Sequence, residues 1–241
     1  MFSRKFETVT GLSLPNNLTS KSPFEVLKWT ILLASIQVLI FVPGCIFKNE
    51  IGSNYYCQKL KLSCTNANKI ALFKTSKGDF EVKLFGKDNP VTVSNFIENI
   101  DNNIYENQKF YKIINYPQLK FVHGGIDPEN KFNIERNQNL NKTSHSKPLE
   151  IKLKEEIKPR YNYQIKNPYE TKNLVNIFDN GSIAMVKRGK NNSSSTEFFF
   201  VTNKIPELDG RYSIFGKIIK GIDILEKINK EDYIKEVEIS N

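Results

Sequence analysis

Few side chains in this 241-residue sequence belong to types that make or break covalent bonds. There are two histidines, His123 and His145, and all three cysteines lie within the first 64 residues. The sequence contains no G-x-G-x-x-G, G-x-S-x-G or H-E-x-x-H motif, and Gly216-x4-Gly221 is followed by Ile-Asp where a phosphate-binding loop needs Lys and Ser or Thr. Hydrolase, nucleotide-transfer and metal-dependent chemistries therefore lack their minimum parts, and we expect neither a metal ion nor a cofactor.

The remaining candidates are apolar and hydrogen-bonding residues in three segments. The first reads FYKII (110–114), the second FVHGG (121–125), and the third spans residues 181–216 with GSIAM, NSSSTEFFF and LDGRYSIFG. Taken together and in this order, the segments resemble the cyclophilins, the cyclophilin-type peptidyl-prolyl cis–trans isomerases. The similarity covers about residues 70–240 and is closest to the bacterial and cyanobacterial branch. It implies a mainly β fold, a closed eight-stranded antiparallel barrel capped by two helices.

The activity that the resemblance implies, isomerisation of Xaa-Pro bonds during protein folding, needs no nucleophile. The barrier of about 18–20 kcal/mol arises from amide conjugation, and no bond breaks. A catalyst can seat the proline ring in an apolar pocket and direct donors at the twisted amide, which binds the transition state better than either planar isomer. In the family an arginine and a glutamine are these donors. Their positions hold Lys112 and His123 in this sequence, so the resemblance implies these two as the catalytic residues.

The resemblance also implies the residues that bind the substrate. Phe199 and Leu208 match the family pattern for the proline pocket, Phe121 stands for a methionine, and Tyr212 stands for a histidine. Further substrate contacts are implied at Met185, Val186 and Glu197.

The match is closer in the apolar residues than in the two donors. Lys112 keeps the positive charge but lacks the planar fork of donors that an arginine offers. Two hypotheses follow: a prolyl isomerase that acts on proline-containing chains, or a catalytically weak cyclophilin-like binding module or chaperone for proline-containing segments.

The elements that must position these side chains are predicted to be mostly strands. Alternation of apolar and polar residues, bounded by turn residues, predicts strands at 70–75, 79–85, 109–114, 119–123, 181–187, 197–202, 212–220 and 233–240. Asn89-Pro90 is typical of a helix start, with Val93, Phe96, Ile97 and Ile100 as a buried stripe, and a second short helix fits residues 222–228. Because strands and helices do not alternate, we expect an antiparallel sheet, closed so that it leaves no edge.

Residues 1–47 are predicted to be a leader with a hydrophobic signal or anchor segment. Residues 29–43 are uncharged and largely apolar, shorter than the roughly 20 residues of a membrane-spanning helix but typical of an export signal. Val42-Pro43-Gly44-Cys45 resembles the bacterial lipoprotein processing box, which makes Cys45 a candidate for lipidation. We expect an exported or membrane-anchored protein on the bacterial periplasmic or thylakoid-lumen side. A cleaved signal, an uncleaved anchor, a lipoprotein and a buried core helix all stay open.

Residues 48–69 are predicted to be a polar tether and residues 70–241 the barrel domain. In an exported chain, Cys57 and Cys64 would close a small disulfide loop; otherwise they are linker thiols. Residues 127–180 are long, polar and rich in Asn and Lys, so we expect an insertion that is functional or partly disordered.

The net charge of +9 suggests at first a nucleic acid or a membrane surface as the partner. Five of the nine excess positive charges, however, lie in residues 1–69. We therefore expect proline-containing polypeptides as partners, a membrane contact through the N-terminal segment, no nucleic acid, and a monomer.

Overall fold

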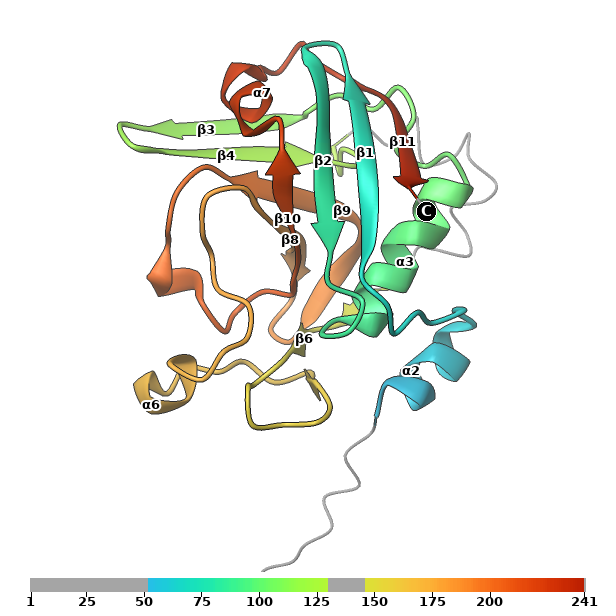
Figure 1. Ribbon diagram of the computed structural model, residues 1–241, viewed down its shortest axis with the longest axis vertical. Helices are drawn as coiled ribbons and strands as arrows, with labels where there is room; N and C mark the ends of the chain where they lie inside the picture. Colours follow the sequence, from blue (N-terminus) through green and yellow to red (C-terminus); the bar gives the residue numbers. More distant parts are fainter. Residues whose placement is uncertain (1–51, 130–145, 241) are drawn as a thin grey trace, which may run out of the picture. The chain divides into compact units, whose positions relative to one another are not determined.

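An antiparallel sheet carries the fold in the computed structural model, which describes residues 52–129 and 146–240. Its strands are β1 (Lys69–Thr75), β2 (Gly78–Leu84), β3 (Lys112–Tyr116), β4 (Leu119–Gly124), β5 (Lys147–Pro148), β8 (Ser182–Arg188), β9 (Asn192–Val201), β10 (Ile214–Lys220) and β11 (Ile234–Ser240). The strand order is β11-β1-β2-β10-β8-β9-β4-β3 (Figure 1), and β5 pairs with β9. The mainly β, antiparallel architecture expected from the sequence is confirmed.

The expectation of a closed barrel is wrong, because the sheet ends at β11 and β3 and forms a half-barrel. The segments ahead of these two strands meet at a single isolated bridge, between Lys109 and Tyr233. Hydrogen bonds from Phe110 N to the Asp232 carbonyl (3.0 Å) and from Ile234 N to the Gln108 carbonyl (2.9 Å) flank this bridge. The contact does not extend into a ladder, since β3 goes on to pair with β4 and β11 with β1.

The described helices are α2 (Ser53–Leu60), α3 (Pro90–Asp101), α6 (Pro168–Thr171) and α7 (Ile222–Lys227), with a 3-10 turn at Pro206–Leu208. Helices α3 and α7 confirm the two expected from the sequence. The buried face of α3 is wider than the predicted apolar stripe. It includes Asn95 and Asn99, which both donate to the carbonyl of Ser195 on β9 at 2.7 Å. These buried amides tie the helix to the strand that carries the candidate site.

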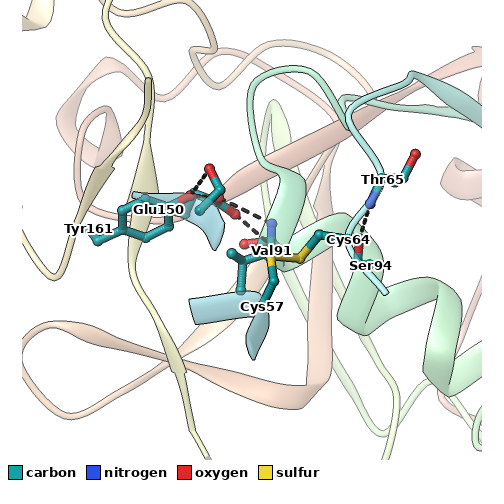
Figure 2. Close-up of a disulfide and its surroundings, with 9 residues drawn as sticks. Cys57, Cys64, Thr65, Val91, Ser94, Glu150 and Tyr161 are labelled. Carbon is teal, nitrogen blue, oxygen red and sulfur yellow. Dashed lines mark hydrogen bonds between the residues drawn. A yellow bond between two sulfur atoms is a disulfide. The ribbon is translucent and has the colours of Figure 1, made fainter. Parts of the chain in front are cut away.

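Helix α2 lies in the stretch expected to be a tether, and a disulfide joins its Cys57 to Cys64 (Figure 2). Cys57 packs in a small buried cluster that includes Val91 of α3. Just after the disulfide, Thr65 N donates to Ser94 Oγ at 2.8 Å. The disulfide, one of the two states that the sequence left open, therefore holds the chain ahead of β1 against the first turns of α3.

The described part of the 127–180 stretch is packed. Besides β5 it contains a two-stranded sheet of β6 (Glu150–Ile151) and β7 (Arg160–Tyr161). Five of its apolar residues form a buried cluster of their own: Leu149, Ile151, Leu153, Ile165 and Leu174.

Glu150 fastens this segment to the start of α3. Its carboxylate accepts from Val91 N at 3.2 Å and Thr92 N at 2.8 Å, and from the Tyr161 hydroxyl at 2.7 Å (Figure 2). The Asn89 side chain makes no capping bond, so a carboxylate from the insertion satisfies the helix N-terminus instead. Burial raises the pKa of Glu150, whereas these donors act to lower it.

Side chains of the sheet pack into two clusters on opposite faces. Along β9, Phe198 and Phe200 belong to the large core, which α3 covers, whereas Phe199 and Val201 belong to a smaller cluster. This alternation follows from the two-residue period of a strand. The smaller cluster is where the candidate site residues gather.

In residues 52–129 and 146–240 no helix is long and apolar enough to span a membrane. The apolar run at 29–43 and Cys45 lie outside the described residues.

Candidate active site

Three neighbouring strands bring Lys112 and His123 next to the apolar cluster. β3 and β4 pair so that Lys112 lies opposite His123, and β4 and β9 pair so that His123 lies opposite Phe199. Phe199 in turn lies opposite Ala184 of β8. Because directly opposed residues project from the same face of a sheet, one row runs from a cation through an imidazole to apolar side chains.

A glycine directly after β4 allows the chain to pass close to β9. Gly125 has φ +94°, and a Cβ there would lie 2.1 Å from the Thr196 carbonyl oxygen. Any side chain at this position would push the strands apart. Gly125 therefore keeps the end of β4, and with it His123, in register with β9.

The imidazole of His123 is neutral at pH 7. Its ring stacks on Phe199 with centroids 5.4 Å apart, and Tyr111 lies 5.9 Å away on another side. Burial, and after it the positive charge of Lys112, lower the pKa of His123 to about 4. A neutral imidazole donates through one nitrogen and accepts through the other. Because its side chain bonds to no group among the described residues, its N–H is available to a bound amide.

Lys112 is exposed at the start of β3. It takes part in none of the ion pairs between described residues. Its ammonium therefore keeps three donors for a ligand.

The smaller cluster contains five of the residues that the sequence analysis assigned to substrate binding: Phe121, Val186, Phe199, Leu208 and Tyr212. Phe199 is buried at its centre, with Phe121 at 6.0 Å and Tyr212 at 5.4 Å between ring centroids. The other four are only partly buried. They present apolar surface on which a proline ring can pack.

Phe178, which no sequence motif singles out, also belongs to this cluster. Its ring stacks on Phe199 at 5.7 Å and meets Tyr212 edge-on at 5.9 Å. Phe178 belongs to none of the recognised segments. An aromatic residue at the end of a polar insertion was the only available signal.

Met185 and Glu197 do not join the apolar surface. Met185 is 1% exposed and belongs to the large core on the opposite face. Glu197 is buried, and its carboxylate accepts from Arg188 Nε at 2.8 Å, from Ser194 Oγ at 2.8 Å and from the Tyr111 hydroxyl at 3.4 Å. The oxygens of Glu197 are thus engaged within the protein, where they position Arg188 and Tyr111 beside the site.

Comparisons with known proteins indicate one family for this chain. The family model described as cyclophilin type peptidyl-prolyl cis-trans isomerase/CLD matches residues 70–241. A peptidyl-prolyl cis-trans isomerase of Helicobacter pylori is 30% identical over 173 residues, which cover 71% of this chain and 86% of that protein. Peptidyl-prolyl cis-trans isomerase 9 of Schizosaccharomyces pombe is 26% identical over 162 residues, 67% of this chain but 22% of that protein's length.

A cyclophilin-type peptidyl-prolyl cis-trans isomerase of Cryptosporidium parvum shares the fold. Its crystal structure gives a TM-score of 0.50 at 21% identity and covers 73% of this chain and 99% of its own. With the family model matching well over half of the sequence, the chain belongs to the cyclophilin-type peptidyl-prolyl cis–trans isomerase family.

Proposed function

We propose that this chain isomerises Xaa-Pro bonds in extended or unfolded polypeptides, with Lys112 as the charged donor and His123 as a neutral one. The observation that carries the proposal is the row from Lys112 through His123 to Phe199, beside a partly exposed apolar cluster. The cluster seats the proline ring, and the two donors reach the amide that must twist.

The two donors act on the amide in different ways. As the amide twists, it loses conjugation and the proline nitrogen becomes a better hydrogen-bond acceptor. The ammonium of Lys112 therefore stabilises the twisted amide more than either planar isomer. His123 donates one N–H without adding a second positive charge beside Lys112, because its pKa of about 4 keeps it neutral.

The test is the rate of cis–trans exchange of a short Xaa-Pro peptide, measured with residues 50–241. These residues form one compact unit that contains all four buried clusters. A fragment that began at residue 70 would lose α2 and the disulfide.

Three variants test the role of Lys112 as the charged donor. Lys112→Ala should lower kcat/KM about 10- to 100-fold, the effect of removing a charged hydrogen-bond donor. Lys112→Arg should keep or raise kcat/KM, because the guanidinium offers more donors in a fixed plane. Lys235→Ala, an exposed cation on β11, is the matched control. A parent fragment that binds the peptide without accelerating exchange would favour the binding-module alternative, and an active Lys112→Ala variant would refute the assignment of Lys112.

We further propose that the N-terminal segment holds this domain at a membrane, on the periplasmic or thylakoid-lumen side, as a monomer. The apolar run at 29–43 supports the anchor, and the Cys57–Cys64 disulfide is typical of an oxidising compartment. Membrane fractionation tests the location, and analytical ultracentrifugation of residues 50–241 tests the oligomeric state. Fatty-acid labelling of the parent and Cys45→Ser chains distinguishes a lipoprotein from a plain anchor. A parent chain recovered in the soluble cytoplasmic fraction would contradict the location.

A further inference from the structure

Cations lie beside two residues of the apolar cluster. Lys187 directly follows Val186 on β8, and Arg211 directly precedes Tyr212. Lys187 is half-buried, whereas Arg211 is exposed. Both cations are therefore neighbours along the chain of residues that we assign to the proline pocket, and the pairing of β8 with β9 is irregular between Met185 and Lys187.

The insertion brings a third cation, Lys166, to the same place. Ile165 N donates to the Gly210 carbonyl at 2.8 Å, and a Cβ on Gly210 would lie 2.3 Å from the Ile165 carbonyl oxygen. Gly210 also has φ +73°, so both its conformation and this close approach favour glycine. Because Lys166 follows Ile165 and Arg211 follows Gly210, the backbone contact sets these two cations in neighbouring positions. We call Lys166, Lys187 and Arg211 the cationic rim.

The cationic rim has no acidic partner among the described residues. None of its three members takes part in the ion pairs found there. Burial lowers the pKa of Lys187, and the positive charges of Lys166 and Arg211 lower it further. The three cations are thus close enough to repel one another, an arrangement that a bound anion would relieve.

The acids of this region do not neutralise the rim. Glu197 is engaged by Arg188. Asp209 accepts a hydrogen bond from Phe178 N at 2.7 Å, and Glu207 is exposed in the same loop. Even with Glu207 and Asp209 counted as charged, the three rim cations outnumber them, and Lys112 adds a fourth positive charge on the other side of the cluster.

We propose that the cationic rim binds acidic side chains that flank the proline, so that the preferred substrates are acidic proline-containing segments. This inference rests on the proposed function and names its substrate class. Lys166 is the specificity residue that the insertion contributes. Exposed charge pairs of this kind each contribute modestly and act together, and added salt screens them.

The experiment compares two peptides of equal length on the full chain, one with Glu and one with Gln on both sides of a single Xaa-Pro bond. The Glu peptide should have a kcat/KM about tenfold higher at low ionic strength, with a smaller advantage at 0.5 M salt. The Kd of each peptide, from the fluorescence anisotropy of a dye-labelled copy, gives the same ratio without turnover.

Variants assign the preference to the rim. Lys166→Gln should lower the Glu-to-Gln ratio about threefold, and Lys166→Glu should lower it further. Lys158→Gln is the matched control, since it removes the same charge from the same insertion. Lys158 instead lines a separate cavity with Gly52 and Tyr55, so this variant should leave the ratio unchanged.

The possible outcomes distinguish a failure of the proposed isomerase function from a failure of the proposed preference for acidic substrates. A chain that turns over neither peptide would contradict the proposed function, and the Kd ratio alone would then decide the charge preference. Equal kcat/KM and equal Kd for the Glu and Gln peptides would overturn the inference. An equal loss of preference in Lys158→Gln and Lys166→Gln would overturn it as well, because the effect would then follow net charge and not the rim.

Discussion

Replacing His123 with glutamine should reduce this protein's loss of stability in acid. Burial and the neighbouring charge of Lys112 hold the pKa of His123 at about 4 in the folded chain, whereas an unfolded histidine titrates near 6.5. Between these two values the unfolded chain binds a proton that the folded chain does not. The free energy of unfolding contributed by this group is therefore fully present above pH 6.5, falls as the pH is lowered toward 4, and levels off below.

The magnitude follows from the difference between the two pKa values. About 1.4 kcal/mol per unit sets a ceiling of about 3 kcal/mol. Between pH 7 and pH 4.5 the chain should lose about 2 kcal/mol through this group. Partial exposure of the ring places the measured value at or below that figure. Glutamine keeps a hydrogen-bond donor at this position but does not titrate.

The assay is urea unfolding of residues 50–241 at pH 7 and pH 4.5, for the parent and His123→Gln. All other titrating groups are common to the two chains, so the difference between the parent and His123→Gln isolates this ring. The parent should lose about 2 kcal/mol more than His123→Gln over this range. Equal losses in the parent and His123→Gln would show that His123 is not held neutral, and would refute the reasoning.

Three further predictions concern the N-terminus of α3, the disulfide and the proline pocket. Glu150→Ala should lower the free energy of unfolding by about 3 kcal/mol, because two backbone N–H groups at the start of α3 lose their acceptor. Urea unfolding measures the loss, with Glu155→Ala as the control variant. Equal losses in the two variants would argue against a capping role for Glu150. Cys57→Ser should cost about 2–3 kcal/mol and expose α2 to protease before the rest of the unit, whereas simultaneous cleavage throughout would show that the disulfide does not hold α2. Phe178→Ala should weaken binding of a proline peptide severalfold in anisotropy titrations, and an unchanged Kd would remove Phe178 from the pocket.

Local patterns were sufficient to predict most elements and the family. Alternation in residues 79–85 predicts β2, and Pro90 marks the first residue of α3 because its fixed φ suits that position. The FYKII and FVHGG segments supply the row of Lys112 and His123, since residues at the same end of two adjoining strands meet across the ladder. Such features depend on neighbours in sequence or on a single strand pair, so sequence patterns are enough to predict them.

The recognised segments alone did not predict which face of the sheet each side chain occupies or whether it is buried. Met185 and Val186 are adjacent in sequence, yet they project to opposite faces, so Met185 enters the large core and Val186 the pocket. Phe178 joins the pocket from outside every recognised segment. Assigning both requires knowing which face of β8 each cluster occupies.

The sequence by itself determined the mainly β family fold, the order of the main strands and of helices α3 and α7, and the strand positions of the candidate donors. Only the tertiary structure decided that the sheet stays open, that Glu150 caps α3, that His123 is neutral and that Lys166 stands beside Arg211. The physical reason is the same each time. Burial and contacts between residues tens of positions apart determine which groups form hydrogen bonds and which side chains are charged. A sequence pattern that repeats every two or four residues does not predict such contacts.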